Sequence, residues 1–323
     1  MDSDFRRRPH NQRNVEQAAR GGDANDADNG SPLNPGNTNM NSSCPSQPDA
    51  RKDFEALCSC ATRILAETQG AAPLPWEQGM AVIAFRKLVL TSTSILRLVP
   101  GSQSSSTACT PLGPDLGSIG VLSRTLVETV LTMRYLLESP RPERERALHR
   151  QVWEYHEYLE RRKIMQSVNS RSPTLGILRQ MCDQRRVDLE RNQAFQDLPR
   201  EGRKQVLRGE KAKLLTNEDI CERAGISRNF YAAMFKYGSN HTHSSPYSFT
   251  LMNSKPSSSG ICSDVIRLTL LIVAGFLSVG IRDYVSAFVS QFQRIPDKEK
   301  EVIALWLGVV KWDLNPFFAR LCE

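Results

Sequence analysis

The chain has 323 residues, 40% of them hydrophobic, and a formal net charge of +7 at pH 7. This length and apolar content are enough for a sizeable buried core, so we predict a globular fold. No apolar stretch follows the arginines near the N-terminus, which excludes an ordinary secretory signal. The eight cysteines contain no C-x-x-C pair, so we predict free thiols and neither a disulfide framework nor a zinc site.

The first 50 residues differ in composition from the rest of the chain. They consist largely of Asn, Asp, Gly, Pro, Ser and Arg, with almost no large apolar side chains. Such a segment cannot bury enough surface to offset the entropy lost on ordering. We therefore predict a disordered tail over residues 1–50 and a single helical domain over residues 51–323.

Helical periodicity is widespread after the tail, and strand signals are scarce. A first helix is predicted over residues 79–101, followed by a loop at 101–118 that is rich in Ser, Gly and Pro. A second helix is expected over about 117–138. A third, long and amphipathic helix is expected from Pro142 onward, with acidic residues in its first turn.

The positive charge is concentrated in residues 161–213. This segment contains fourteen Lys and Arg against six Asp and Glu, so its local net charge of +8 exceeds the +7 of the whole chain. We predict short helices there, broken at Ser172-Pro173, Pro199 and Gly209. The charge favours contact with RNA or another acidic partner, although basic surface helices also occur in proteins that bind no nucleic acid.

Capping signals mark two helices after the basic segment. Thr216, with Asp219 three residues on, is predicted to start a helix that ends at Gly225. Ser227 is predicted to cap the next helix, which runs toward His243.

The longest apolar run without a charged residue is Leu268–Ile281. A helix that crosses a bilayer needs ~20 apolar residues, so we interpret this shorter run as part of a buried central helix over about 263–292. A loop at 244–260 is expected to precede it, and a last helix to start near Asp297. We therefore predict an all-α multi-helix bundle in a cytoplasmic protein without membrane contact.

Two charged residues interrupt the apolar second helix at a spacing of four. Arg124 and Glu128 share one face of a helix that is apolar almost all round. Because an isolated buried charge is far too costly, these side chains must pair or find other partners. The order Arg before Glu is the weaker one for supporting a helix, which argues against a mere surface pair.

A second pattern lies on the helix that Ser227 caps. Tyr231, Phe235, Ser239 and His243 recur every four residues and form a slightly drifting stripe. His243 is expected at or just beyond the helix C-terminus, where an imidazole can interact with the helix dipole or bond terminal carbonyls. Tyr231 and Phe235 are expected to be core contacts.

These two patterns together resemble a large, uncharacterised bacterial family of helical proteins of unknown function. The matching residues are Arg124-T-L-V-Glu128 and Tyr231-A-A-M-Phe235-K-Y-G-Ser239-N-H-T-His243. The similarity covers roughly residues 80–290. The family has no established activity to carry over.

A more distant likeness is to HEPN domains, helical bundles that often act as metal-independent ribonucleases in toxin and phage-defence systems. Their motif places an Arg shortly before a His at a helix end, and a dimer commonly completes the site. Here Lys236 stands before His241 with four residues between them, and before His243 with six. Lysine lacks the bidentate fork of arginine, and we expect Arg124 to supply the guanidinium from the neighbouring helix.

The HEPN likeness implies a ribonuclease of bacterial defence or stress response that uses neither metal nor cofactor and forms a homodimer. RNA would be cleaved by attack of its own 2′-hydroxyl. His243 or His241 would act as general base or acid, and Arg124 or Lys236 would stabilise the charge on phosphorus. Glu128 would orient a cationic partner.

The same residues also allow a non-catalytic interpretation. Arg124, Glu128, Ser239 and His243 would then form one buried hydrogen-bonded network that fixes the register of two helices in an interaction module. Metal binding has little support, because no Cys, Asp or Glu lies close in sequence to His241 and His243. The sequence alone does not decide between a catalytic site and a structural network.

Overall fold

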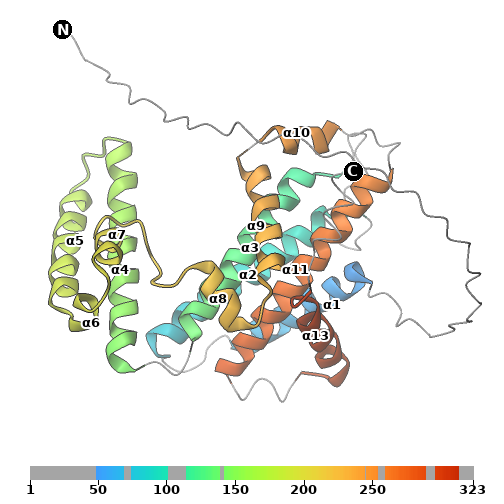
Figure 1. The fold of residues 1–323 in the computed structure, drawn as a ribbon, viewed down its shortest axis with the longest axis horizontal. Helices are drawn as coiled ribbons and strands as arrows, with labels where there is room; N and C mark the ends of the chain where they lie inside the picture. The colour runs from blue at the N-terminus through green and yellow to red at the C-terminus, as the bar shows by residue number, and fades with distance from the viewer. Residues whose placement is uncertain are drawn as a thin grey trace, which may run out of the picture. The chain divides into compact units, whose positions relative to one another are not determined.

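The computed structural model describes residues 49–68, 74–100, 114–138, 142–243, 245–253, 259–288 and 295–312. Almost all of the tail predicted to be disordered, and most of the loop predicted at 101–118, lie outside these ranges. Within them the chain forms helices and no strands (Figure 1). The prediction of an all-α multi-helix bundle is confirmed.

The helices follow one another in this order: α1 (Ala50–Thr68), α2 (Trp76–Leu98), α3 (Leu116–Leu137), α4 (Glu143–Ser167), α5 (Thr174–Arg191), α6 (Gln193–Gln196), α7 (Arg200–Leu207), α8 (Asn217–Ala224), α9 (Arg228–Thr242), α10 (Pro246–Asn253), α11 (Ser259–Ala287) and α13 (Asp297–Val309).

Local signals set several helix ends where the sequence predicts them. Thr216 and Asp219 form the expected capping box of α8, and Gly225 ends that helix with a left-handed φ of 72°. The Ser227 side chain caps α9 by accepting a hydrogen bond from the backbone N–H of Phe230. The predicted loop at 244–260 is wrong in part, because residues 246–253 form α10. Its proline occupies the first helical position, where the missing N–H costs nothing.

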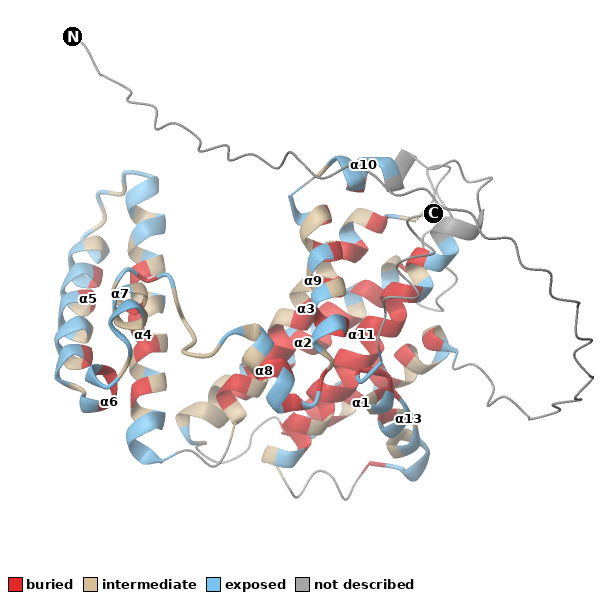
Figure 2. Cartoon of the chain, in the orientation of Figure 1, coloured by how far each residue is buried: buried red, intermediate tan, exposed pale blue. Residues whose placement is uncertain are grey.

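α11 lies at the centre of the main hydrophobic core, as predicted from its apolar run. Every residue from 268 to 281 is buried, and α11 packs against α1, α2, α3 and α13 (Figure 2). The ring of Phe85 on α2 stacks on Tyr284 of α11, with ring centroids 3.9 Å apart. Phe230 of α9 lies 5.7 Å from Phe276, so the same core also holds the helix that carries the aromatic stripe.

A second, smaller hydrophobic cluster joins α4, α5, α6 and α7. Its buried members are Leu148, Val152, Tyr155, Leu159, Cys182, Leu189, Ala194, Phe195 and Val206. The Tyr155 hydroxyl donates a hydrogen bond to the Leu207 carbonyl at 3.0 Å, which ties α4 to the end of α7. The basic segment therefore folds around apolar contacts of its own, and the single domain over residues 51–323 stays a prediction.

Three helices are long and apolar enough to cross a membrane, by length and composition. They cover residues 76–98, 116–137 and 263–287. This finding contradicts the predicted cytoplasmic localisation, which considered only an uninterrupted apolar run. α2 and α3 each contain a stretch of eighteen residues that is apolar enough to cross a membrane even though up to two of these residues are charged. Of the three windows, that of α2 is the least buried within the fold, at 44% against 78% for α11.

Candidate functional site

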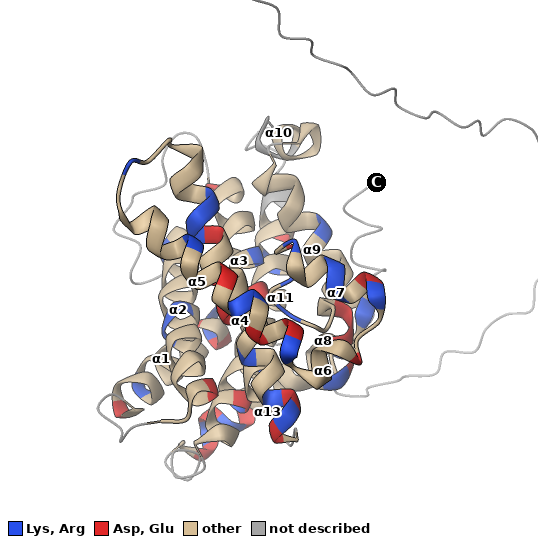
Figure 3. Ribbon diagram, turned by 90° about the vertical axis from the view of Figure 1, so that its left-hand side faces the viewer, with Lys and Arg blue, Asp and Glu red and all other residues tan. Residues whose placement is uncertain are grey.

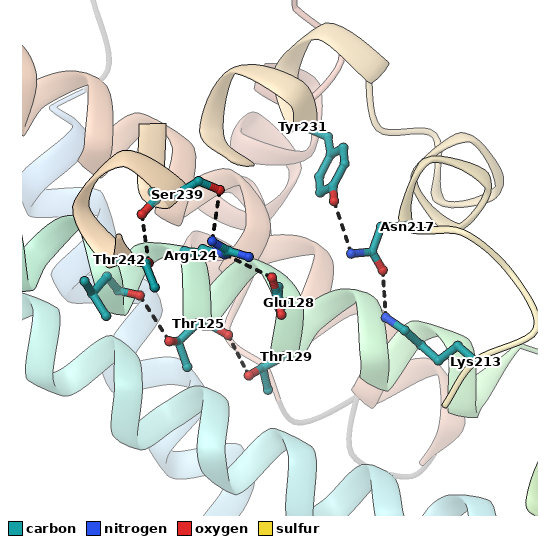
Figure 4. Close-up of polar contacts among 11 residues, drawn as sticks. Arg124, Thr125, Glu128, Thr129, Lys213, Asn217, Tyr231, Ser239 and Thr242 are labelled. Carbon is teal, nitrogen blue, oxygen red and sulfur yellow. Dashed lines mark hydrogen bonds and ion pairs between the residues drawn. The ribbon is translucent and has the colours of Figure 1, made fainter. Parts of the chain in front are cut away.

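The structure brings Arg124 of α3 together with Glu128 of α3 and Ser239 of α9. Arg124 Nε lies 3.1 Å from Glu128 Oε1, and Arg124 Nη1 donates to Ser239 Oγ at 2.9 Å (Figure 4). The guanidinium also lies over the ring of Phe235, with Cζ 4.6 Å from the centroid. One arginine thus connects the two sequence patterns through a hydrogen bond and a cation–π contact, and an ion pair with Glu128 on its own helix orients it.

Two glycines allow α3 and α9 to approach this closely. A Cβ added at Gly238 would lie 2.7 Å from the Arg124 Cβ and 3.3 Å from the Gly120 carbonyl oxygen. A Cβ added at Gly120 would lie 2.5 Å from Cδ2 of His241. Any larger residue at these points would push the helices apart and separate Arg124 from Ser239.

The two histidines at the end of α9 have different environments. His241 is only 7% exposed, packs edge-to-face on Tyr237, and neither ring nitrogen has a hydrogen-bond partner among the described residues. His243 is exposed at the C-cap, where its backbone N–H donates to the Ser239 carbonyl at 3.0 Å. Among the described side chains, no hydrogen bond or ion pair joins His243 to Arg124. The arginine network therefore extends to Ser239 and not to His243.

Burial lowers the pKa of His241, an effect that Asp115 partly offsets. Its pKa is thus lower in the folded than in the unfolded protein, so acid favours unfolding. We expect stability to be unaffected above about pH 6.5, the ordinary pKa of histidine, and to fall as the pH drops below it. In His241→Leu, the free energy of unfolding should fall less between pH 7.5 and pH 5.5 than it does in the wild type. Urea unfolding at the two pH values measures this difference. An unchanged pH dependence in the variant would contradict a neutral buried imidazole.

Lys236 is exposed on the same helix. Residues three and seven positions apart share a helix face, so Lys236, Ser239 and His243 lie along one side of α9. Two helical turns, about 11 Å of rise, separate the backbone positions of Lys236 and His243. A long substrate can contact both.

Arg124 and Glu128 line a cavity of about 550 Å³. Lys87 of α2, Trp153 of α4 and Thr242 of α9 form other parts of its wall. Threonines of α3 also line it, and their hydroxyls donate to backbone carbonyls of their own helix: Thr125 to Val121 at 3.1 Å and Thr129 to Thr125 at 2.7 Å. Their remaining lone pairs can accept hydrogen bonds, so the cavity offers two cations, a carboxylate and acceptor oxygens.

A second polar chain lies near Glu128. Lys213 Nζ donates to Asn217 Oδ1 at 2.7 Å, and Asn217 Nδ2 donates to the Tyr231 hydroxyl at 3.1 Å (Figure 4). Burial lowers the pKa of Lys213, while Glu128 raises it, and burial raises the pKa of Tyr231 to about 12. The sequence pattern included Tyr231 but missed Lys213 and Asn217. In the sequence, the only feature that marks Lys213 and Asn217 is their position close to the capping box of α8.

The cysteine side chains that the structure describes form no disulfide. Cys58, Cys60, Cys182 and Cys221 are free and buried. Within the described ranges, no group of three or more His, Cys, Asp and Glu side chains is placed to hold a metal ion.

The fold is all-α, and an arginine–glutamate pair bonded to a serine on a second helix does not by itself identify a reaction. Residues 80–260 match the family model DUF5677, described as a family of unknown function, and the chain belongs to this family. The predicted resemblance to an uncharacterised helical family is thereby confirmed. No curated protein and no solved structure matches the chain.

Proposed function

We propose that this chain acts on RNA in a HEPN-like manner, with Arg124 holding a phosphate and His243 transferring protons. The observation that supports this most is the position of Arg124. It lines the cavity of about 550 Å³ while Glu128 and Ser239 fix its guanidinium, and the exposed His243 follows Ser239 by one helical turn. Phosphoryl chemistry requires a preoriented cation and an accessible imidazole, and this chain offers them on Arg124 of α3 and at the end of α9, the helix that Arg124 bonds.

In this mechanism the substrate supplies the nucleophile. His243 accepts the proton of an RNA 2′-hydroxyl, and the oxygen attacks the adjacent phosphorus. The bond from phosphorus to the 5′-oxygen breaks, and the leaving oxygen takes the proton from the imidazolium. The products are a 2′,3′-cyclic phosphate and a free 5′-hydroxyl. Arg124, with Lys236 farther along α9, stabilises the negative charge that builds on the phosphate oxygens.

The basic segment supports contact with the RNA backbone only in part. Several of its cations already pair with carboxylates, including Arg185 with Glu154 at 2.9 Å and Arg186 with Glu190 at 3.0 Å. Figure 3 shows basic and acidic residues interspersed on α4 and α5. Arg171 and Arg179 form no ion pair with any described residue and stay available for phosphates. A homodimer, as in the HEPN likeness, would bring a second basic segment.

A second candidate is a non-catalytic interaction module. The contacts of Arg124 with Ser239 and Phe235 favour it, because they tie α3 to α9 whether or not a substrate binds. In this case the arginine stabilises the fold, and His243 is an ordinary C-cap residue.

Expression in bacteria separates the two candidates. We expect the wild type to slow growth and degrade cellular RNA under stress, and His243→Ala and His243→Gln to restore both. Exposed Lys298 on α13 provides a matched surface control, because Lys298→Ala should behave like the wild type. A wild type that leaves growth and RNA intact, or a His243→Ala protein that is equally active, would rule out the nuclease. Circular dichroism shows whether each variant folds.

A further inference from the structure

The positive charge of the basic segment is unevenly distributed. Residues 161–182 contain five arginines and lysines and no acidic residue, and all six carboxylates of the basic segment follow, from Asp183 onward. This stretch covers the end of α4, the turn after it and the first half of α5. We call it the α4–α5 tip.

The α4–α5 tip also carries three aliphatic side chains that are more than half exposed. Val168 is 70% exposed, Ile164 64% and Ile177 56%. Val168 and Ile164 are the most exposed large hydrophobic side chains that the structure describes. They are one helical turn apart, and Ile177 lies near the start of α5, which packs against α4. Exposed apolar side chains that gather in one place indicate an interaction surface, whereas single scattered ones do not.

The backbone of the tip is well defined. The N–H of Asn169 donates to the Gln166 carbonyl at 3.0 Å, and that of Ser170 donates to the Met165 carbonyl at 2.9 Å. With the left-handed φ of 50° at Asn169, these two bonds form a common helix C-terminal motif. In Figure 2 the ends of α4 and α5 that meet at this turn are largely exposed. The aliphatic side chains therefore stand exposed on an ordered turn.

The cations of the tip are available to an anionic partner. Arg171 and Arg179 are exposed and form no ion pair with any described residue. Arg161 and Lys163 pair only with glutamate side chains of α4 that are themselves 44% and 43% exposed. Ion pairs as exposed as these contribute little, so a ligand can replace them.

The combination of aliphatic and cationic side chains identifies the partner. Proteins hold single-stranded RNA with aromatic side chains between the cations, and residues 161–182 contain no aromatic residue. Phosphate contacts alone would also leave the three aliphatic side chains in water. The surface of an anionic bilayer provides phosphates for the cations and an acyl boundary for the aliphatic groups.

We propose that the α4–α5 tip binds the surface of an anionic lipid bilayer. Ile164, Val168 and Ile177 enter the boundary between headgroups and acyl chains, and Arg171 and Arg179 contact lipid phosphates. Contact with a membrane is compatible with the three apolar helices described above. The proposal does not depend on the reaction at Arg124.

Flotation of the full chain with lipid vesicles tests the proposal. We expect vesicles of phosphatidylglycerol and phosphatidylcholine in equal parts to bind at least about tenfold more tightly than phosphatidylcholine alone, and this preference to weaken as salt is added. Equal binding to both kinds of vesicle would assign the contact to the apolar helices and overturn the proposal. No binding to the anionic vesicles would overturn it as well.

The aliphatic contribution is tested by Ile164→Ser combined with Ile177→Ser. This double variant should weaken binding to the anionic vesicles at least about tenfold, because two apolar groups no longer leave water. Leu90→Ser is the matched control, since Leu90 is 61% exposed on α2. A loss of binding in Leu90→Ser, or full binding by the double variant, would contradict the assignment to the tip.

The contribution of charge is tested by Arg171→Gln combined with Arg179→Gln, which should also weaken binding about tenfold or more. Arg86→Gln combined with Arg97→Gln, two exposed positions of α2, should have no such effect. Equal losses in the two double variants would show that only net charge matters and overturn the proposal. Circular dichroism checks folding, and if one tip variant does not fold, the other and the lipid preference of the wild type decide.

Labelled single-stranded RNA distinguishes the competing partner. RNA binding that the Arg171→Gln and Arg179→Gln changes abolish, in a protein that does not bind anionic vesicles, would assign the tip to RNA and overturn the proposal. Vesicle binding should be unchanged in His243→Ala. The membrane contact and the proposed cleavage of RNA can therefore fail separately.

Discussion

Replacing Gly120 with alanine is expected to lower the free energy of unfolding by about 1–3 kcal/mol, the usual cost of overpacking a tight contact. The added Cβ would lie 2.5 Å from the ring of His241, which is itself buried. The ring has little room to move, so the strain should pass into the crossing of α3 and α9. Urea unfolding measures the effect as a lower midpoint at an unchanged m-value.

Gly79 provides the matched control. It also lies in a helix, but a Cβ there would meet nothing within 4 Å. Gly79→Ala should therefore be neutral or stabilise the protein by up to about 1 kcal/mol, as alanine does in an unhindered helix. If Gly120→Ala were as stable as Gly79→Ala, this would contradict the tight contact between α3 and α9 at Gly120.

Arg124→Gln is expected to destabilise the protein by about 2–3 kcal/mol. The variant loses the ion pair with Glu128, the charge-assisted hydrogen bond to Ser239 and the contact with the Phe235 ring. The Arg124 side chain is 22% exposed, so solvent replaces these contacts only in part. Arg124→Lys should recover less than half of the loss, because an ammonium group lacks the planar fork.

Arg86 serves as the comparison for this variant. It is exposed on α2, and Arg86→Gln should change stability by no more than about 0.5 kcal/mol. Denaturant midpoints of the two variants give the comparison directly. A loss in Arg124→Gln no larger than that in Arg86→Gln would mean that the arginine network does not hold the helices together.

Local sequence signals predicted several of the helices and some of their ends, but they missed α1 and placed α10 in a loop. The capping box at Thr216 and the left-handed Gly225 depend on residues within one turn, so the sequence alone defines them. The need for Arg124 to pair also followed from the apolar helix around it, and the structure supplies Glu128 and Ser239 as the partners.

Features that arise from tertiary packing were not predicted. Gly238 lies against the Arg124 side chain and the Gly120 carbonyl, a contact that the residue spacing along α9 does not reveal. Lys213 and Asn217 reach Tyr231 through a fold that no short window of sequence contains. The prediction of a cytoplasmic localisation was wrong for a related reason. It considered a single apolar run, which does not reveal how apolar the other long helices are.

The proposal that Arg124 and His243 cleave RNA is tested most directly by the chemistry of the product ends. Purified protein would be incubated with a labelled RNA in the presence of EDTA, and the fragment ends identified by mass spectrometry. The account predicts 2′,3′-cyclic phosphate and 5′-hydroxyl ends from the wild type, and intact RNA from folded His243→Ala. Intact RNA with the wild type, or the same fragments from His243→Ala, would contradict it.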